Sequence, residues 1–122
     1  MRRAYLFSLV LMMIGFLTGC YYDVEEELYP NKFCVVGDAT MANYYTEQVA
    51  PIIETRCAIP GCHVAGGSAP GNFLQYTEVK ARVDDGKIQL LVFDQRSMPP
   101  SGVLPSCDIL KLQAWVAAGA PN

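Results

Sequence analysis

Cys57, Cys62 and His63 carry the clearest chemical signal in this sequence of 122 residues. Four residues separate the two thiols, and the imidazole directly follows the second thiol. Thiols paired in this way can add to the two vinyl groups of a porphyrin, and the adjacent imidazole can then bind the iron. The usual gap between such cysteines is two residues, so the wider gap weakens the signal taken alone. The rest of the chain therefore has to decide whether these residues hold a haem.

Other uses of the two thiols have to be weighed. Cys57 and Cys62 could form a disulfide that closes a small loop, which an oxidising compartment would favour. A zinc site would need a further ligand from Cys34 or Cys107, and neither has a partner at metal-site spacing. A thioredoxin-like redox site does not fit, because the spacing differs and no βαβ pattern surrounds the thiols. The disulfide is the main competitor to haem attachment.

The N-terminus has the pattern of an export signal. A basic pair at residues 2–3 precedes an almost unbroken apolar stretch at residues 4–16, which is too short to span a membrane. Residues 17–20 read Leu-Thr-Gly-Cys and resemble the lipobox of bacterial lipoproteins. This resemblance implies a lipoprotein signal peptide at residues 1–19 and a lipidated cysteine at Cys20. The alternative is an ordinary signal peptide that is cut nearby, with Cys20 incidental.

The expected location follows from this signal. We expect the mature chain in the cell envelope, outside the cytoplasm, attached to a membrane by the lipid on Cys20. Tyr21 stands where an aspartate marks inner-membrane retention in some bacteria, which favours the outer membrane, on its periplasmic or its surface face. Residues 20–33 carry an acidic run and are predicted to form a tether before a single domain at residues 34–122. The 12 acidic residues outnumber the 9 basic ones, and no basic patch suggests a nucleic-acid partner.

The spacing of apolar residues predicts helices separated by long loops. The predicted elements are a helix from Thr46, as its cap, to about Arg56; a short helix capped by Thr77 and running through Val83; a run from Lys87 to Phe93 that is either helical or extended; and a final helix from Ser106 to about Ala118. Residues 64–72 and 94–105 are rich in turn formers and are predicted to be loops. The expected buried stripe of the final helix is Leu112, Trp115, Val116 and Gly119, and Gly119 with Pro121 is expected to stop the helix. No sustained alternation predicts a strand, so the expected fold class is mostly α.

Four groups of residues together resemble a small class I-type cytochrome c domain, of the kind that some bacterial lipoproteins carry. They are Pro51-Ile52-Ile53 before the first cysteine, Cys57 to Cys62-His63, Met98-Pro99-Pro100, and the final helix from Leu112 through Trp115 to Pro121. The matches cover residues 45–121, and members of this group with four residues between the haem cysteines occur. The resemblance implies a helical domain whose long loops surround one haem c, attached covalently to Cys57 and Cys62.

The resemblance also implies that His63 and Met98 are the two iron ligands. In this family the second ligand is a methionine on a loop well after the histidine, and prolines beside Met98 stiffen that loop. Met41, the other methionine after Cys20, precedes the first predicted helix. Thioether sulfur favours ferrous iron, so this ligand pair gives a higher reduction potential than two histidines. The alternative for Met98 is a residue that merely fills the core.

These expectations describe a membrane-anchored monohaem c-type cytochrome that transfers single electrons and is not itself an enzyme. The sequence does not identify its redox partners. An iron without the Met98 ligand would instead have an open position, suited to peroxidase-like chemistry or ligand sensing. Without any haem, the chain would be a disulfide-stabilised lipoprotein that acts as an interaction module.

Cys34 and Cys107 are the pair that is left over when Cys20 is lipidated and two cysteines hold haem, so we predict that they form a disulfide. The bridge would pin the N-terminal arm to the start of the final helix. The enclosed loop spans most of the domain, so the chain-entropy model gives a stabilisation on the order of 4 kcal/mol.

Three further expectations concern the surroundings of the haem. Arg56 or Arg96 could pair with a haem propionate, with a solvated arginine as the equal alternative. The carbonyl of Pro70, or of a neighbour in that loop, is expected to accept a hydrogen bond from the ring nitrogen of His63 that does not face iron. Trp115 is expected in the core, where the last helix packs on the first.

Overall fold

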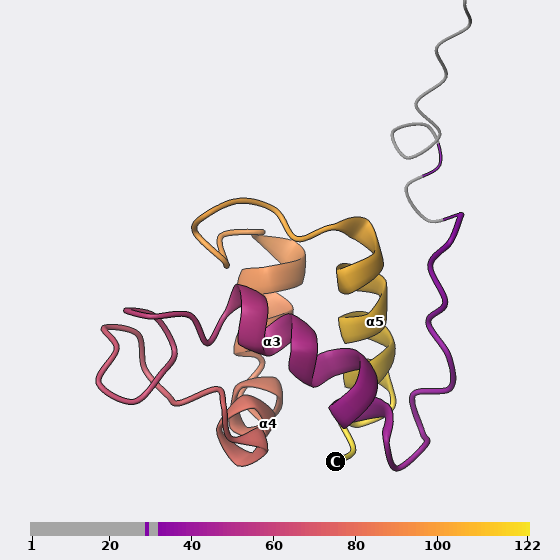
Figure 1. The fold of residues 1–122 in the computed structure, drawn as a ribbon, viewed down its shortest axis with the longest axis horizontal. Coiled ribbons are helices and arrows are strands. Elements are labelled where there is room, and N and C mark those ends of the chain that lie inside the picture. The colour runs from indigo at the N-terminus through magenta and orange to yellow at the C-terminus, as the bar shows by residue number, and fades with distance from the viewer. Residues whose placement is uncertain (1–28, 30–31) are drawn as a thin grey trace, which may run out of the picture.

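The computed structural model describes Tyr29 and residues 32–122, and Figure 1 shows a small group of helices joined by long loops. The helices are η1 (Tyr45–Val49), α3 (Ala50–Arg56), α4 (Tyr76–Asp84), η2 (Gln89–Asp94) and α5 (Ser106–Ala117). The described residues contain no strand, which confirms the predicted mostly α class. No helix in this part of the chain is long and apolar enough to cross a membrane. The predicted signal peptide, Cys20 and most of the predicted tether lie outside the described residues.

The first helix consists of a wide turn, η1, that continues into α3, and it differs from the prediction at its start. Thr46 does not cap the helix, because the helical conformation begins before it and no side chain caps the first turn. The wide turn has a local cause in Pro51, which has no N–H to donate and whose ring would crowd the carbonyl four residues earlier. The N–H of Ala50 accordingly bonds to the carbonyl of Tyr45, five residues back, in the π-helical pattern.

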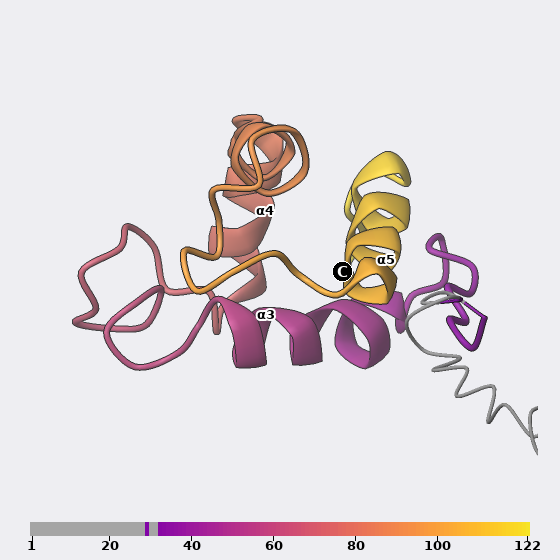
Figure 2. The same cartoon turned by 90° about the horizontal axis from the view of Figure 1, so that it is seen from above.

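The core lies between this first helix and the helices α4 and α5. Figures 1 and 2 show α3 lying across one side of both. Full or nearly full burial is shared by Val49, Ile53, Val79 of α4 and Trp115 of α5. The ring centroids of Tyr45 and Trp115 lie 5.3 Å apart, so α5 packs on η1 through an aromatic contact. Trp115 is therefore a core residue, as predicted.

α5 ends in a Schellman motif close to the predicted stop. The N–H of Ala120 bonds to the carbonyl of Trp115 at 2.8 Å, and the N–H of Gly119 bonds to the carbonyl of Val116 at 3.0 Å. Gly119 adopts a φ of +87°, which a residue without a Cβ enters at no steric cost. Its predicted place in the buried stripe is wrong, because Gly119 is exposed and terminates the helix instead. The indole N–H of Trp115 donates to the carbonyl of Pro121 at 2.7 Å and holds the chain end against the core.

The two shorter helices form where the sequence predicts or permits helical turns. α4 begins two residues earlier and ends one residue later than predicted. Thr77 does not cap it, since Gln75 occupies the cap position without a side-chain hydrogen bond. For residues 87–93 the sequence permits a helix or an extended segment. The structure has helical turns there, of the wide π type over η2.

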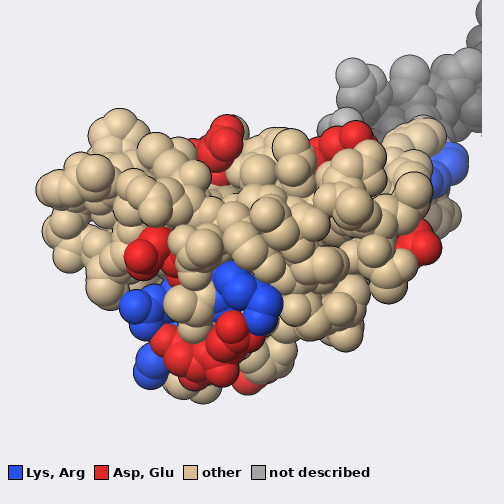
Figure 3. All heavy atoms as spheres, turned by 90° about the horizontal axis from the view of Figure 1, so that it is seen from below, with Lys and Arg blue, Asp and Glu red and all other residues tan. Residues whose placement is uncertain are grey.

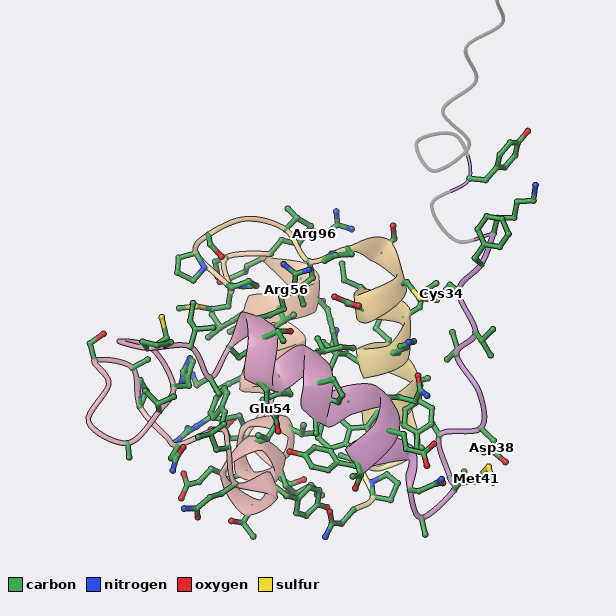
Figure 4. The ribbon with its side chains drawn as sticks, in the orientation of Figure 1. Cys34, Asp38, Met41, Glu54, Arg56 and Arg96 are labelled. Atoms are coloured by element: carbon green, nitrogen blue, oxygen red, sulfur yellow. A yellow bond between two sulfur atoms is a disulfide. The ribbon has the colours of Figure 1, made fainter. Side chains whose placement is uncertain are left out.

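Cys34 and Cys107 form a disulfide, as predicted, with their Cα atoms 5.5 Å apart. The bridge attaches the N-terminal arm, residues 32–43, to the first turn of α5, as Figure 4 shows at the Cys34 label. A second attachment follows directly after the arm, where the hydroxyl of Tyr44 donates to the carbonyl of Lys111 at 3.2 Å. The arm is thus joined to α5 at two points.

Candidate functional site

The chain leaves α3 at Cys57 and forms a loop that returns at Phe73. We name residues 57–73 the Cys–His loop, and Figure 1 shows it projecting at one end of the molecule. α3 positions the start of this loop, because the N–H groups of Cys57 and Ala58 both bond to the carbonyl of Ile53, at 2.9 and 2.8 Å. The first thiol is therefore placed by the last turn of a helix.

The residues between the two thiols form a tight turn. The N–H of Cys62 bonds to the carbonyl of Ile59 at 2.9 Å, and Gly61 adopts a φ of +84°. Proline in the second position and a glycine with positive φ in the third are the residues that a type II turn requires, and Pro60 and Gly61 supply them. The four residues between Cys57 and Cys62 therefore form a compact turn and not an extended connection.

A second set of contacts closes the Cys–His loop on itself. Ser68 donates to the carbonyl of Gly61 through its N–H at 3.1 Å and through its hydroxyl at 2.8 Å. The N–H of Gly67 bonds to the carbonyl of Val64 at 2.9 Å. A Cβ at Gly67 would lie 1.9 Å from the carbonyl oxygen of Cys62, so only glycine permits this approach of backbone to backbone. The backbone carbonyl of Cys62 is thus packed closely against Gly67 of the same loop.

His63 is fixed by its backbone and by its ring. Its N–H bonds to the carbonyl of Cys57 at 3.2 Å, and its carbonyl accepts the N–H of Phe73 at 2.9 Å. Nδ1 of the ring lies 2.9 Å from the carbonyl oxygen of Pro70, which is the predicted partner. A carbonyl oxygen can only accept, so Nδ1 carries the proton and, in the neutral imidazole, Nε2 has the free lone pair that a metal requires.

The face of the His63 ring lies against Phe73. The two ring centroids are 3.9 Å apart, and the ring planes differ by 5°. Phe73 is buried, whereas His63 is half-buried. The imidazole is thus held at one nitrogen by Pro70 and over one flat face by Phe73.

Cys57 and Cys62 are both free thiols and both half-buried. Burial, and to a smaller extent the charge that Cys62 would carry, raise the pKa of Cys57 to about 11. At neutral pH Cys57 is therefore protonated and a weak nucleophile.

Met98 lies on the separate loop of residues 95–105. The N–H groups of Ser97 and Met98 both bond to the carbonyl of Leu91, at 2.9 and 3.1 Å, so η2 holds this loop. Figures 1 and 2 agree in placing part of the loop beside the C-terminal end of α3, where the Cys–His loop begins. The side chain of Met98 is 38 % exposed, so it does not fill the core. Met41 lies in the N-terminal arm, at the other end of the molecule (Figure 4).

The two arginines lie on the same side of the molecule, as their labels in Figure 4 show. Nε of Arg56 is 3.9 Å from a carboxylate oxygen of Asp108 in α5, and its side chain is half-exposed. Arg96 is exposed and has a φ of 51°. Their pairing with propionates stays a prediction. No three His, Cys, Asp or Glu side chains gather as a metal-ligand set in the part of the chain that is described, so the zinc alternative gains no support.

The Cys–His loop carries no acidic residue, lysine or arginine. Lys, Arg, Asp and Glu are absent from residues 57–77. Figure 3 shows the charged side chains gathered mainly in one region of the face seen from below, while the outermost end of the molecule on the left is uncharged. Two ion pairs lie on α4 and its C-terminal turn, Lys80 with Asp84 and Arg82 with Asp85. The candidate site is therefore set in uncharged surroundings.

Sequence reasoning missed two residues that shape the site, Gly67 and Phe73. The signal for Phe73 is its place, since it is the first aromatic residue after the glycine-rich loop that follows His63. Gly67 has no such signal, because one of several glycines in a loop does not reveal which of them meets another backbone segment. The structure brings Cys57, Cys62 and His63 together in one loop, whereas Cys20 lies outside the described residues.

Comparison with known proteins assigns this chain to no family. No protein-family model matches the sequence, and no match is found among curated proteins or among solved structures. The residues of the site are therefore the basis for any functional conclusion.

Proposed function

We propose that this protein is a membrane-anchored monohaem c-type cytochrome that transfers single electrons outside the cytoplasm. The observation that carries the proposal is the state of His63, whose Nδ1 is bound to the carbonyl of Pro70 while Nε2 is free to take a metal. Two free thiols, Cys57 and Cys62, lie on the same closed loop. An imidazole so oriented next to two unpaired thiols is the donor set that covalent haem attachment needs.

The donor atoms of the chain fit a haem c. Cys57 and Cys62 are free although another cysteine pair in the same chain is bridged, so the thiols are available for two thioether bonds. Met98 is partly exposed on a loop that η2 holds, and it would be the second iron ligand. A haem held by these residues would supply a one-electron redox centre. With Met98 and His63 both as iron ligands, the thioether would favour the ferrous state and raise the reduction potential.

The chain itself holds the Cys–His loop, and His63 with it, by several internal contacts. The turn that ends at Cys62 and the contacts of Ser68 and Gly67 tie the Cys–His loop together at several points. A ligand set that does not rearrange between two oxidation states suits an electron carrier, because less reorganisation accompanies each electron. We place the protein in the cell envelope, lipid-anchored through Cys20 and facing the periplasm or the surface from the outer membrane. The lipobox at residues 17–20 supports that location.

The first test asks whether haem is covalently attached. The full-length chain is matured in a host with haem-attachment machinery, and a denaturing gel is stained for haem and combined with intact mass. We expect wild-type protein to retain one haem after denaturation and Cys57→Ala/Cys62→Ala to retain none. Cys34→Ser/Cys107→Ser is the matched control, because it removes two cysteines of the same chain that are already paired with each other. A colourless wild-type protein would refute the proposal and favour the haem-free interaction module.

A second test concerns the Met98 ligand. Met98→Leu should abolish the ferric iron–methionine absorbance band and lower the reduction potential, while Met41→Leu should change neither. Met41 is a suitable control because it is the other methionine of the described chain and is 57 % exposed. If Met98→Leu leaves the spectrum of the haem-loaded protein unchanged, the iron has a different sixth ligand or an open position. An open position would point to the peroxidase or sensor alternative.

A further inference from the structure

The imidazole of His63 is held by two neighbours that come from one short segment. Pro70 supplies the carbonyl that binds Nδ1, and Phe73 supplies the ring that covers one face of the imidazole. We propose that Phe73 is a positioning residue that sets the plane of the His63 ring. This inference rests on the proposed function and names a residue that governs how the iron ligand is presented.

The hydrogen bond alone leaves the ring plane loosely defined. The torsion that turns a histidine ring about its bond to Cβ has broad minima, and a hydrogen bond tolerates considerable misalignment. A flat partner restricts the same rotation directly, because turning the imidazole by a large angle would drive its edge into the phenyl ring. With planes 5° apart and centroids 3.9 Å apart, the His63–Phe73 stack is close to contact distance. The stack on Phe73 therefore restricts rotation of the His63 ring about its bond to Cβ more tightly than the hydrogen bond to Pro70 does.

The ring of Phe73 is itself fixed in position, so it can set the orientation of the His63 ring. Its side chain is 6 % exposed, and its N–H bonds to the carbonyl of His63 at 2.9 Å, so the two residues are joined by backbone as well as by ring contact. Gly71, with a φ of +91°, lets the chain pass beside the phenyl edge, since a Cβ at this position would lie 3.1 Å from Cε1 of Phe73. The phenyl ring is enclosed by neighbouring residues.

The plane of an axial imidazole matters because it determines which iron d orbitals its π system overlaps. Groups that orient a metal-bound histidine tune the metal as well as the ligand. Loss of the Phe73 ring should therefore change the g values and the reduction potential of the iron without removing any ligand atom. If Phe73 only filled space, its loss would leave both quantities unchanged.

The experiment compares haem-loaded variants by electron paramagnetic resonance of the ferric protein and by potentiometric titration. Phe73→Leu keeps an apolar side chain but has no flat face, and we expect a shift or broadening of the largest g value and a shifted potential. Phe73→Tyr keeps the ring and should restore the wild-type spectrum. Val79→Ala is the control for general destabilisation, since it removes fully buried volume from α4. It should lower the thermal midpoint and leave the g values unchanged.

The outcomes separate this inference from the proposed function. Wild-type protein without covalent haem would refute both. A haem-loaded Phe73→Leu with wild-type g values and line widths would overturn the positioning role alone. Phe73→Met provides a second variant without a flat face. If neither variant retains haem while Val79→Ala does, Phe73 has a structural role and the positioning role is overturned.

Discussion

Removal of the Cys34–Cys107 bridge should destabilise the fold strongly without affecting haem attachment. The bridge spans a sequence separation of 73 residues. The chain-entropy model assigns a closed loop of that length a stabilisation of about 4 kcal/mol, because the bridge restricts the unfolded chain. One kcal/mol shifts the thermal midpoint of a domain of this size by roughly 4–8 °C, so the expected decrease is roughly 15–30 °C.

The assay is thermal unfolding of the haem-loaded protein, followed by far-ultraviolet circular dichroism. Cys34→Ser/Cys107→Ser is compared with wild type, both with and without dithiothreitol. The reductant opens a disulfide but leaves thioether bonds intact, so it should lower the midpoint of the wild type toward that of the double variant and leave the double variant unchanged. Once the haem of every sample has been brought to the same oxidation state, the haem absorbance of the folded protein should be the same in all four samples.

Two results would contradict this reasoning. Equal midpoints for wild type and double variant would mean that the bridge does not restrict the unfolded chain as the entropy model requires. Loss of covalent haem from the double variant would mean that Cys34 or Cys107 takes part in haem attachment. The division of the cysteines into one structural pair and one haem pair would then be wrong.

Three further predictions concern the packing and the thiols. Gly67→Ala should reduce both haem loading and the thermal midpoint, because the new Cβ would lie 1.9 Å from the carbonyl oxygen of Cys62. Unchanged haem loading would mean that the Cys–His loop opens freely to accommodate the Cβ. Trp115→Phe removes the indole donor to Pro121 and should cost about 1–3 kcal/mol in denaturant unfolding. In haem-free Cys62→Ser protein, alkylation of Cys57 should have a midpoint above the ordinary thiol pKa of 9.0, because burial favours the neutral thiol. The folding free energy that this buried thiol contributes is complete below pH 9 and is lost as the pH rises above 9. An alkylation midpoint equal to that of urea-unfolded protein would contradict the burial.

The sequence predicted the features that depend on local patterns. The final helix, its termination near Gly119 and the burial of Trp115 follow from apolar spacing and from the conformational freedom of glycine, and the structure agrees on each except the exposure of Gly119. The Cys34–Cys107 bridge followed from the number of cysteines. The Pro70 contact followed from the general need of a ligating histidine for a partner on its second nitrogen.

The features that escaped prediction depend on contacts across the loop. The stack of Phe73 on His63 and the approach of Gly67 to Cys62 arise when the Cys–His loop closes, and no periodicity in the sequence encodes them. The wide turn of η1 was missed for a related reason. Pro51 lies near the predicted start of this helix, but its effect on the preceding turn depends on where the helix begins.

The Cys34–Cys107 disulfide also determines where the N-terminal tether would be attached to the folded domain. Figure 1 shows the Cys–His loop at one end of the molecule, and the bridge at Cys34 lies toward the other end (Figure 4). A chain anchored at Cys20 would have 13 residues between the lipidated cysteine and Cys34, which limits the reach of the tether to about 50 Å. Reduction of the bridge would move the first attachment point along the arm toward Tyr44 and lengthen that tether. The bridge would therefore act as a spacer, limiting how far the site can reach from the membrane to a partner.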